Sequence, residues 1–269
     1  MDKQDIGSVN IETMSPHEFR MLVRSGAWQD VNTDACPGYA QANLVVLPES
    51  LAFDFFQFCH RNPRPCPVIE VTDPGQYHSL ICAPGADLRT DIPKYRIFEN
   101  GKIVDEPYDI QQYWKDDLVA FLLGCSTNFD YILRKSIVKY RYIGDYTTNI
   151  NCVSTKHFHG SMVVSTRLFR TSHDAVRAIQ ITSRNPAAHG PPVHIGNLEE
   201  IGIEDIYNPD MFSFDGSISP VASTETIMSW ACGVTPQICA LKSRIPFMIT
   251  HFPGHMFVTD RFSEELSSF

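Results

Sequence analysis

Short apolar runs alternate with segments of helical character along most of this chain. The runs at 44–47, 161–166 and 247–250 are rich in aliphatic residues and are bounded by Gly, Pro or polar residues, which is typical of buried strands. Strands that alternate with helices usually form a parallel sheet covered by those helices. We therefore predict a mixed α/β fold with a partly parallel sheet flanked by helices.

Capping signals predict three helices among these strands. Ser15 and Glu18 have the spacing of a capping box, so a helix should begin there. The segment 110–123 is predicted to be a helix because Gly124, which follows it, is favoured just beyond a helix C-terminus. A third helix is predicted at 127–135.

The middle of the chain has a different pattern. Asn100-Gly101 is a strong hairpin turn signal, and short β-branched runs surround it. Residues 66–150 therefore read as a smaller inserted α+β subdomain, and residues 1–65 and 151–269 as the main α/β subdomain, with approximate boundaries.

Composition narrows the classes of protein that fit. Hydrophobic residues make up 43% of the 269 residues, and the formal charge is −9. An acidic chain lacks the basic footprint of a nucleic-acid-binding protein. No apolar run reaches the roughly 18 residues of a membrane helix, and the first residues lack the apolar core of a signal peptide. We expect a cytoplasmic protein with no nucleic-acid or membrane partner.

The eight cysteines are scattered and form no CxxC pair. In a long chain with no secretion signal, this favours reduced thiols over disulfides or a zinc site. We expect no bound metal.

Polar, Gly- and Pro-rich loops follow several of the predicted strands. In α/β proteins, ligands bind outside the carboxyl ends of strands, so these loops indicate an enzyme active site. The loops are 87–91, 124–126, 183–186, 189–194, 233–236 and 250–255.

The loop at 87–91 offers one way to hold a carboxylate. Arg89 could bind a substrate carboxylate through two hydrogen bonds while Asp87 or Asp91 handles the amine or a proton. The alternative is a loop braced by its own Arg–Asp pairs. Arg167 and Arg184 follow other apolar runs and are further carboxylate binders, or surface ion pairs.

Cys125 and Ser126 lie where one helix is predicted to end and another to begin. A helix N-terminus can lower the pKa of a thiol and make it nucleophilic, whereas the alternative is a small buried residue at a tight corner. The Gly233–Thr235 turn precedes another helix, and its backbone N–H groups could hold an oxyanion or merely cap that helix.

Four histidines lie in these loops. His189 is a candidate general acid or base, and His194 a substrate contact, although a structural histidine is an equal alternative for one of them. His251 and His255 have the spacing of a zinc-binding helix, but Pro253-Gly254 between them disfavours a helix, so they remain candidate substrate contacts.

Eight ordered blocks carry a resemblance to a known family. They are GYAQANLVVLP, NPRPCPVIEV, APGADLRTDIPKY, DDLVAFLLGCS, GSMVVSTR, AIQITSRNPAAHGPPVHIG, WACGVTPQ and ITHFPGHMFVTD. Together they resemble the bacterial hydro-lyase family, which is related to the cyclase domain of mitochondrial D-glutamate cyclase. The resemblance implies a cofactor-independent lyase that removes water from a small amino-acid-like carboxylate, for example D-glutamate closing to 5-oxo-D-proline.

This chain also departs from the family pattern. GCSTNFD at 124–130 stands where the family usually reads GCSFSFE, GDYTTNI precedes residue 151 in place of a VPMY-like segment, and residues 213–227 are longer and more polar. Two alternatives follow: a related lyase or hydratase acting on a different small acid in a specialised pathway, and a non-catalytic protein that binds a small acid. A homodimer is the default expectation for an enzyme of this kind.

Overall fold

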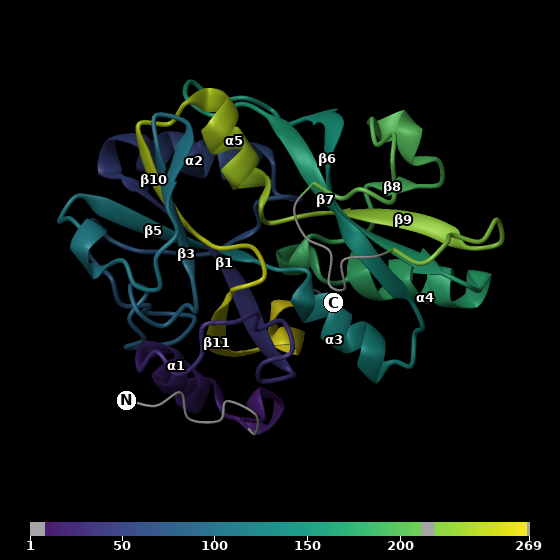
Figure 1. Ribbon diagram of the computed structural model, residues 1–269, viewed down its shortest axis with the longest axis horizontal. Coiled ribbons are helices and arrows are strands. Elements are labelled where there is room, and N and C mark those ends of the chain that lie inside the picture. The colour runs from purple at the N-terminus through teal and green to yellow at the C-terminus, as the bar shows by residue number, and fades with distance from the viewer. Residues whose placement is uncertain (1–8, 211–217, 268–269) are drawn as a thin grey trace.

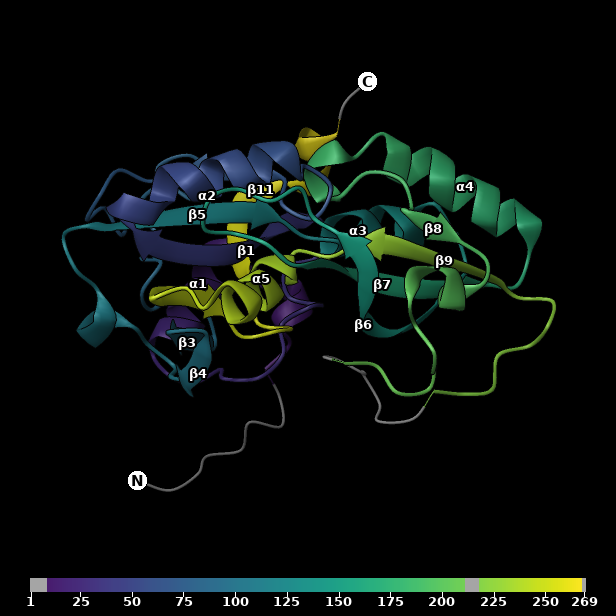
Figure 2. The ribbon, with the colours of Figure 1, turned by 90° about the horizontal axis from the view of Figure 1, so that it is seen from above.

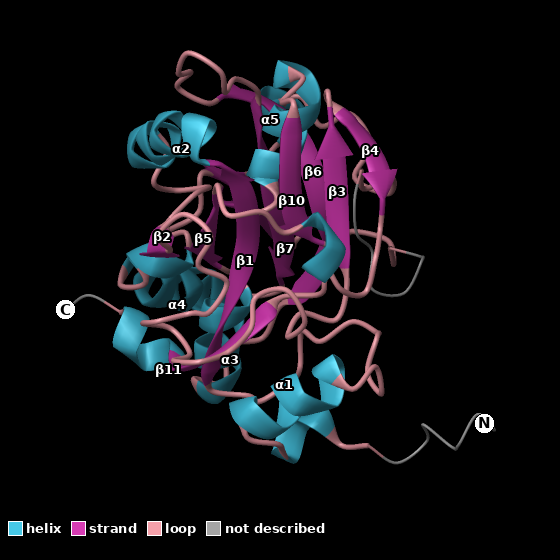
Figure 3. Ribbon diagram, turned by 90° about the vertical axis from the view of Figure 1, so that its left-hand side faces the viewer, coloured by secondary structure: helices cyan, strands magenta, loops and turns pink. Residues whose placement is uncertain are grey.

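The computed structural model describes residues 9–210 and 218–267, and these fold into two sheets. Residues 213–217 of the polar segment noted above lie outside the described residues. The larger sheet has the order β2-β5-β1-β10-β3-β4, with β11 also paired to β1, and the smaller sheet has the order β6-β7-β9-β8. Figure 1 shows the two sheets side by side, and Figure 3 shows the larger one in this order.

The strands and helices have the following bounds. The strands are β1 (Tyr39–Pro48), β2 (Val68–Val71), β3 (Tyr95–Glu99), β4 (Lys102–Asp105), β5 (Leu118–Gly124), β6 (Arg141–Asn151), β7 (Ser161–Phe169), β8 (His194–Ile195), β9 (Thr226–Ala231), β10 (Phe247–His251) and β11 (Phe257–Phe262). The α-helices are α1 (Pro16–Arg24), α2 (Glu49–Arg61), α3 (Thr127–Lys135), α4 (Ser172–Ser183) and α5 (Thr235–Ser243).

The mixed α/β class is confirmed, but the prediction of a partly parallel sheet is wrong. Every strand pairing among the described residues is antiparallel. The reason lies in the connections. Helix α2 links β1 to β2, which run in the same direction, but β5 is inserted between them; likewise α4 links β7 to β8, and β9 is inserted between those two. In each of these two pairs, the strands joined by a helix are therefore parallel to each other but are not neighbours in the sheet.

Strands β1 and β5 are buried on both faces. Val45 and Leu47 of β1 face a core shared with the smaller sheet, while Leu44 and Val46 face a second core on the opposite side. Figure 2 shows α2 lying over β5 and β1. Because both faces are apolar, β5 reads as a continuous hydrophobic run with no alternation. The predicted helix at 110–123 is wrong for this reason, since residues 118–124 form this strand.

Other local predictions are confirmed. The capping box at Ser15 and Glu18 is present at the start of α1. Residues 127–135 form α3, and Asn100-Gly101 turns the chain between β3 and β4. The division into subdomains stays a prediction. Among the described residues, no helix has both the length and the apolar character needed to cross a bilayer.

Candidate active site

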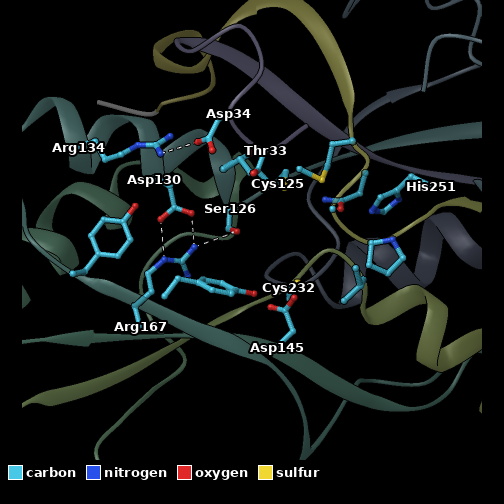
Figure 4. A pocket seen from close by; sticks show the side chains of 18 of the residues that line it. Thr33, Asp34, Cys125, Ser126, Asp130, Arg134, Asp145, Arg167, Cys232 and His251 are labelled. Atoms are coloured by element: carbon cyan, nitrogen blue, oxygen red, sulfur yellow. Dashed lines mark hydrogen bonds and ion pairs between the residues drawn. The ribbon is translucent and has the colours of Figure 1, made fainter. Parts of the chain in front are cut away.

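A cavity of about 460 Å³ lies where the two sheets meet. The larger sheet contributes residues of β1 and β10 and the segment that follows β5, and the smaller sheet contributes β6, β7 and the segment that follows β9. Figure 4 shows these side chains converging from both sheets. The buried residues of its inner end are Asn43, Cys125, Asp145 and His251, together with the half-buried Cys232.

Asp145 of β6 is the most strongly perturbed carboxyl group of the cavity. Its side chain is 7% exposed, and burial raises its pKa to about 6, although hydrogen bonds from Tyr142 and Cys232 and the charge of Arg167 favour the ionised form. Its Oδ1 atom is buried without a hydrogen-bond partner in the described part of the chain. A carboxyl group that titrates near neutral pH can both take up and release protons.

His251, the last residue of β10, lines the same end of the cavity. Its Nδ1 accepts a hydrogen bond from the backbone N–H of Leu44 at 3.2 Å, and burial lowers its pKa to about 4. The ring is therefore neutral at pH 7. Nδ1 also lies 3.4 Å from the Leu44 carbonyl, but the shorter contact with the Leu44 N–H favours the tautomer that carries its proton on Nε2. Nε2 is buried and has no partner among the described residues, so it can donate to a ligand.

Cys125 and Cys232 bring two thiols to the cavity. Cys125 immediately precedes Ser126 at the start of α3, as predicted, but it follows strand β5 and not the end of a helix. Its pKa is nevertheless raised, because burial outweighs the stabilisation of the thiolate by Thr127. Burial also raises the pKa of Cys232. Of the two alternatives for Cys125, its burial and raised pKa favour the small buried residue at a tight corner over the activated nucleophile.

Arg167 of β7 lines the cavity and forms a buried ion pair there. Its guanidinium donates to Asp130 of α3 through Nε at 2.8 Å and through a second nitrogen at 2.5 Å, and to the Ser165 hydroxyl at 3.0 Å. The rings of Phe129 and Trp230 lie 4.8 and 5.4 Å from it. Nearly all of its donors are satisfied within the protein, so this arginine fixes α3 against the smaller sheet.

The Gly233–Thr235 turn lies in the cavity wall between β9 and α5. A Cβ atom at Gly233 would overlap the side-chain amide of Asn43, which itself donates to the carbonyl of Gly124 at 2.8 Å. The Thr235 hydroxyl donates to the Cys232 carbonyl at 2.7 Å and accepts from Val163 N–H at 3.0 Å. Gly233 thus makes room for Asn43, and Thr235 is committed to the fold.

The structure places the predicted carboxylate-binding loop outside this cavity. Arg89 donates to both carboxylate oxygens of Asp87 at 3.0 and 2.9 Å, and its guanidinium lies 3.3 Å from the ring of Tyr77. Asp91 accepts two hydrogen bonds of 2.7 Å from Arg24. These contacts match the internally braced alternative for this loop.

The remaining candidates, three histidines and one arginine, do not line the cavity. His189 is buried, with Nδ1 2.7 Å from the Arg64 carbonyl, and His255 lies with Nδ1 2.9 Å from the Pro253 carbonyl; neither lines the cavity. His194 of β8 lies with its Nε2 atom 2.8 Å from the Asn197 carbonyl. Arg184 lines a separate groove beside α4. Of the candidates predicted from the sequence, Cys125, Ser126, Arg167 and His251 line the cavity directly.

Sequence reasoning missed Asp145, Asn43 and Cys232 as site residues. Asn43 and Asp145 are buried polar residues within strands, where no motif marks them. A signal was present for each, because Asn43 interrupts an apolar run and Asp145 lies in GDYTTNI, one of the departures from the family pattern. A polar residue in a buried strand position is informative because it needs a partner or a ligand.

Comparison with known proteins identifies the family of this chain. The family model for D-glutamate cyclase matches residues 119–260, which run from within β5 to within β11 and include most of the cavity wall. A Geobacillus kaustophilus protein described as a "Putative hydro-lyase" is 48% identical over 259 residues, covering 94% of this chain and 97% of that one. Bacillus licheniformis and Bacillus subtilis proteins with the same description are 47% and 46% identical, each over 94% of this chain. The chain belongs to the D-glutamate cyclase family.

Proposed function

We propose that this protein is a lyase that removes water from a small amino-acid-like carboxylate, and that it closes D-glutamate to 5-oxo-D-proline. One observation carries the proposal. Asp145 Oδ1 and His251 Nε2 are buried, have no partner within the described residues and belong to side chains that line one cavity. Buried polar atoms that lack partners are costly unless a ligand satisfies them.

The reaction needs only proton transfer. The substrate nitrogen attacks the side-chain carboxyl carbon, a C–N bond forms, and a C–O bond breaks as water leaves. Both hydrogens of that water come from the ammonium group. The Asp145 carboxylate takes them one at a time and delivers each to the departing oxygen, while His251 Nε2–H donates to the oxygen that remains.

This assignment favours a route without a covalent intermediate. A thioester route would need a thiolate at Cys125, and the raised pKa of that thiol opposes one. The atoms and charges balance without electron transfer, so the proposed reaction needs no redox cofactor.

The test is to incubate the purified protein with D-glutamate, L-glutamate and 5-oxoproline, and to follow the gain or loss of water by mass spectrometry. We expect D-glutamate to be converted and L-glutamate to remain. The Asp145→Asn variant tests the group assigned to proton transfer and should lose turnover by about 100-fold or more. Absence of conversion by the folded wild-type protein would refute the D-glutamate assignment.

A second candidate is a related lyase or hydratase acting on a different small acid. Thr127, one of the residues that differ from the family pattern, lines the cavity and therefore lies where a substrate would contact it. A panel of small amino and hydroxy acids distinguishes the two, because this candidate requires another acid to turn over better than D-glutamate. Binding without turnover of any acid would instead identify a binding protein.

A further inference from the structure

The outer end of the cavity is basic, although the whole chain is acidic. Arg134 of α3 and Lys139, which follows it, both line this end and are exposed. Asp34 is the one acidic residue among the exposed residues that line the cavity within the described chain. Figure 4 shows Arg134 and Asp34 at one end of the cavity and His251 at the other. We call Arg134 and Lys139 the basic rim.

Helix α3 connects the basic rim with the inner end. Ser126, Asp130 and Arg134 are spaced at intervals of four residues, which puts them on one face of the helix, and all three line the cavity. Phe129 and Leu133 point away into a separate core. From Thr127 to Arg134 the helix rises roughly 10 Å. The cavity therefore offers a second position for a polar group along the length of α3.

The cations of the cavity differ in their freedom to bind a ligand. Arg167 is fully buried and donates to Asp130 and Ser165. Arg134 instead makes a single 3.0 Å contact with Asp34, and their side chains are 53% and 58% exposed. An exposed pair of this kind contributes little to stability, so a ligand can replace Asp34 at low cost. The Lys139 ammonium has no ion pair in the described part of the chain.

We propose that the basic rim binds a second anionic group of the substrate, so that a dicarboxylic acid lies along α3. One carboxyl group then lies at Asp145 and His251, and the other is held by Arg134 and Lys139. This inference rests on the proposed function, because it takes the reacting carboxyl group to lie at the inner end.

Binding of unreactive acids tests the basic rim without turnover. Glutarate and pentanoate have the same number of carbons, but a methyl group in pentanoate replaces the second carboxylate of glutarate. We expect the wild-type protein to bind glutarate about tenfold more tightly than pentanoate in calorimetric titrations, because charged hydrogen bonds at the rim add to the affinity. The double variant Arg134→Gln, Lys139→Gln should bind the two acids equally.

A matched control and a turnover assay separate the possible failures. Arg177→Gln removes an exposed arginine of the separate groove beside α4 and should keep the preference for glutarate. A preference that survives in the double rim variant, or no binding of glutarate by the wild-type protein, overturns the proposal. A preference that the rim variant abolishes, in a protein that does not convert D-glutamate, supports the rim while the proposed reaction fails.

Discussion

At the scale of single residues, the carboxyl group of Asp145 couples the chemistry of the cavity to the stability of the fold. The folded protein holds its proton up to about pH 6, whereas the reference pKa of an aspartate is 3.8. Between these values the unfolded chain releases a proton that the folded chain retains. The free energy of unfolding therefore falls as pH rises from about 4 to about 6. The ionised form of Asp145 therefore lowers the stability of the fold. A destabilising ionisable residue that lines a cavity is typical of a functional group.

Replacing Asp145 with Asn should remove this pH-dependent cost. Because a shift of about two pKa units corresponds to about 3 kcal/mol, the variant should gain stability relative to wild type by up to that amount between pH 4 and pH 7. Urea unfolding of both proteins at a series of pH values measures it. A difference in stability that does not change with pH would show that Asp145 does not titrate in this range.

The thiol of Cys125 provides a second prediction at this scale. Because burial raises its pKa, the thiol is protonated at neutral pH and is a poor nucleophile. Cys125→Ser should keep most of the turnover of the proposed reaction, and so should Cys232→Ser, the matched change at the other thiol of the cavity. Loss of turnover in Cys125→Ser alone, with unchanged thermal unfolding, would establish a covalent route through this residue.

Among the elements, helix α3 takes part in two Arg–Asp pairs, one buried and one exposed to solvent. The fully buried guanidinium of Arg167, in β7, pairs with Asp130 of the helix. Arg134 of the helix pairs with Asp34 in solvent. The buried pair fixes the helix against the smaller sheet, and so sets the position of Ser126 and Cys125 at its start. The exposed pair leaves the outer part of the same helix free to exchange partners.

The two pairs should respond differently to the same change. Asp130→Asn leaves a buried guanidinium without its carboxylate and should lower the free energy of unfolding by about 3–5 kcal/mol. Asp34→Asn should lower it by less than about 1 kcal/mol. Denaturant unfolding of the two variants provides the comparison, and equal losses would contradict the structural role assigned to Arg167.

At the scale of the whole molecule, the fold was predictable from the sequence in class but not in topology. The capping box at Ser15 and the Asn100-Gly101 hairpin depend on neighbouring residues, so local sequence predicts them. The insertion of β5 between β1 and β2 depends on contacts between segments far apart in the chain. Local periodicity does not indicate which strand fills such a gap. Both faces of β5 are buried, so its sequence lacks the alternation of a half-buried strand and predicts a helix instead.

The difference between local and long-range contacts also decides which site residues could be predicted from the sequence. Cys125, Ser126 and His251 are in loops or at strand ends, where polar residues stand out. Asp145 is in the interior of a strand, and its raised pKa arises from burial in the folded molecule. Arg89 and Asp91 stood out equally in the sequence, yet they are paired with Asp87 and Arg24. Composition of a loop therefore does not separate charges that bind a ligand from charges that bind each other.

The contrast between the two ends of the cavity bears on how the molecule can change over generations. Substitutions at the buried end alter the groups that the proposed reaction needs. Arg134 and Lys139 are solvent-exposed, so exchanging them alters what the cavity attracts at little cost to folding. Descendants of such a chain can acquire new ligand preferences through a few surface changes while inheriting the reactive end intact.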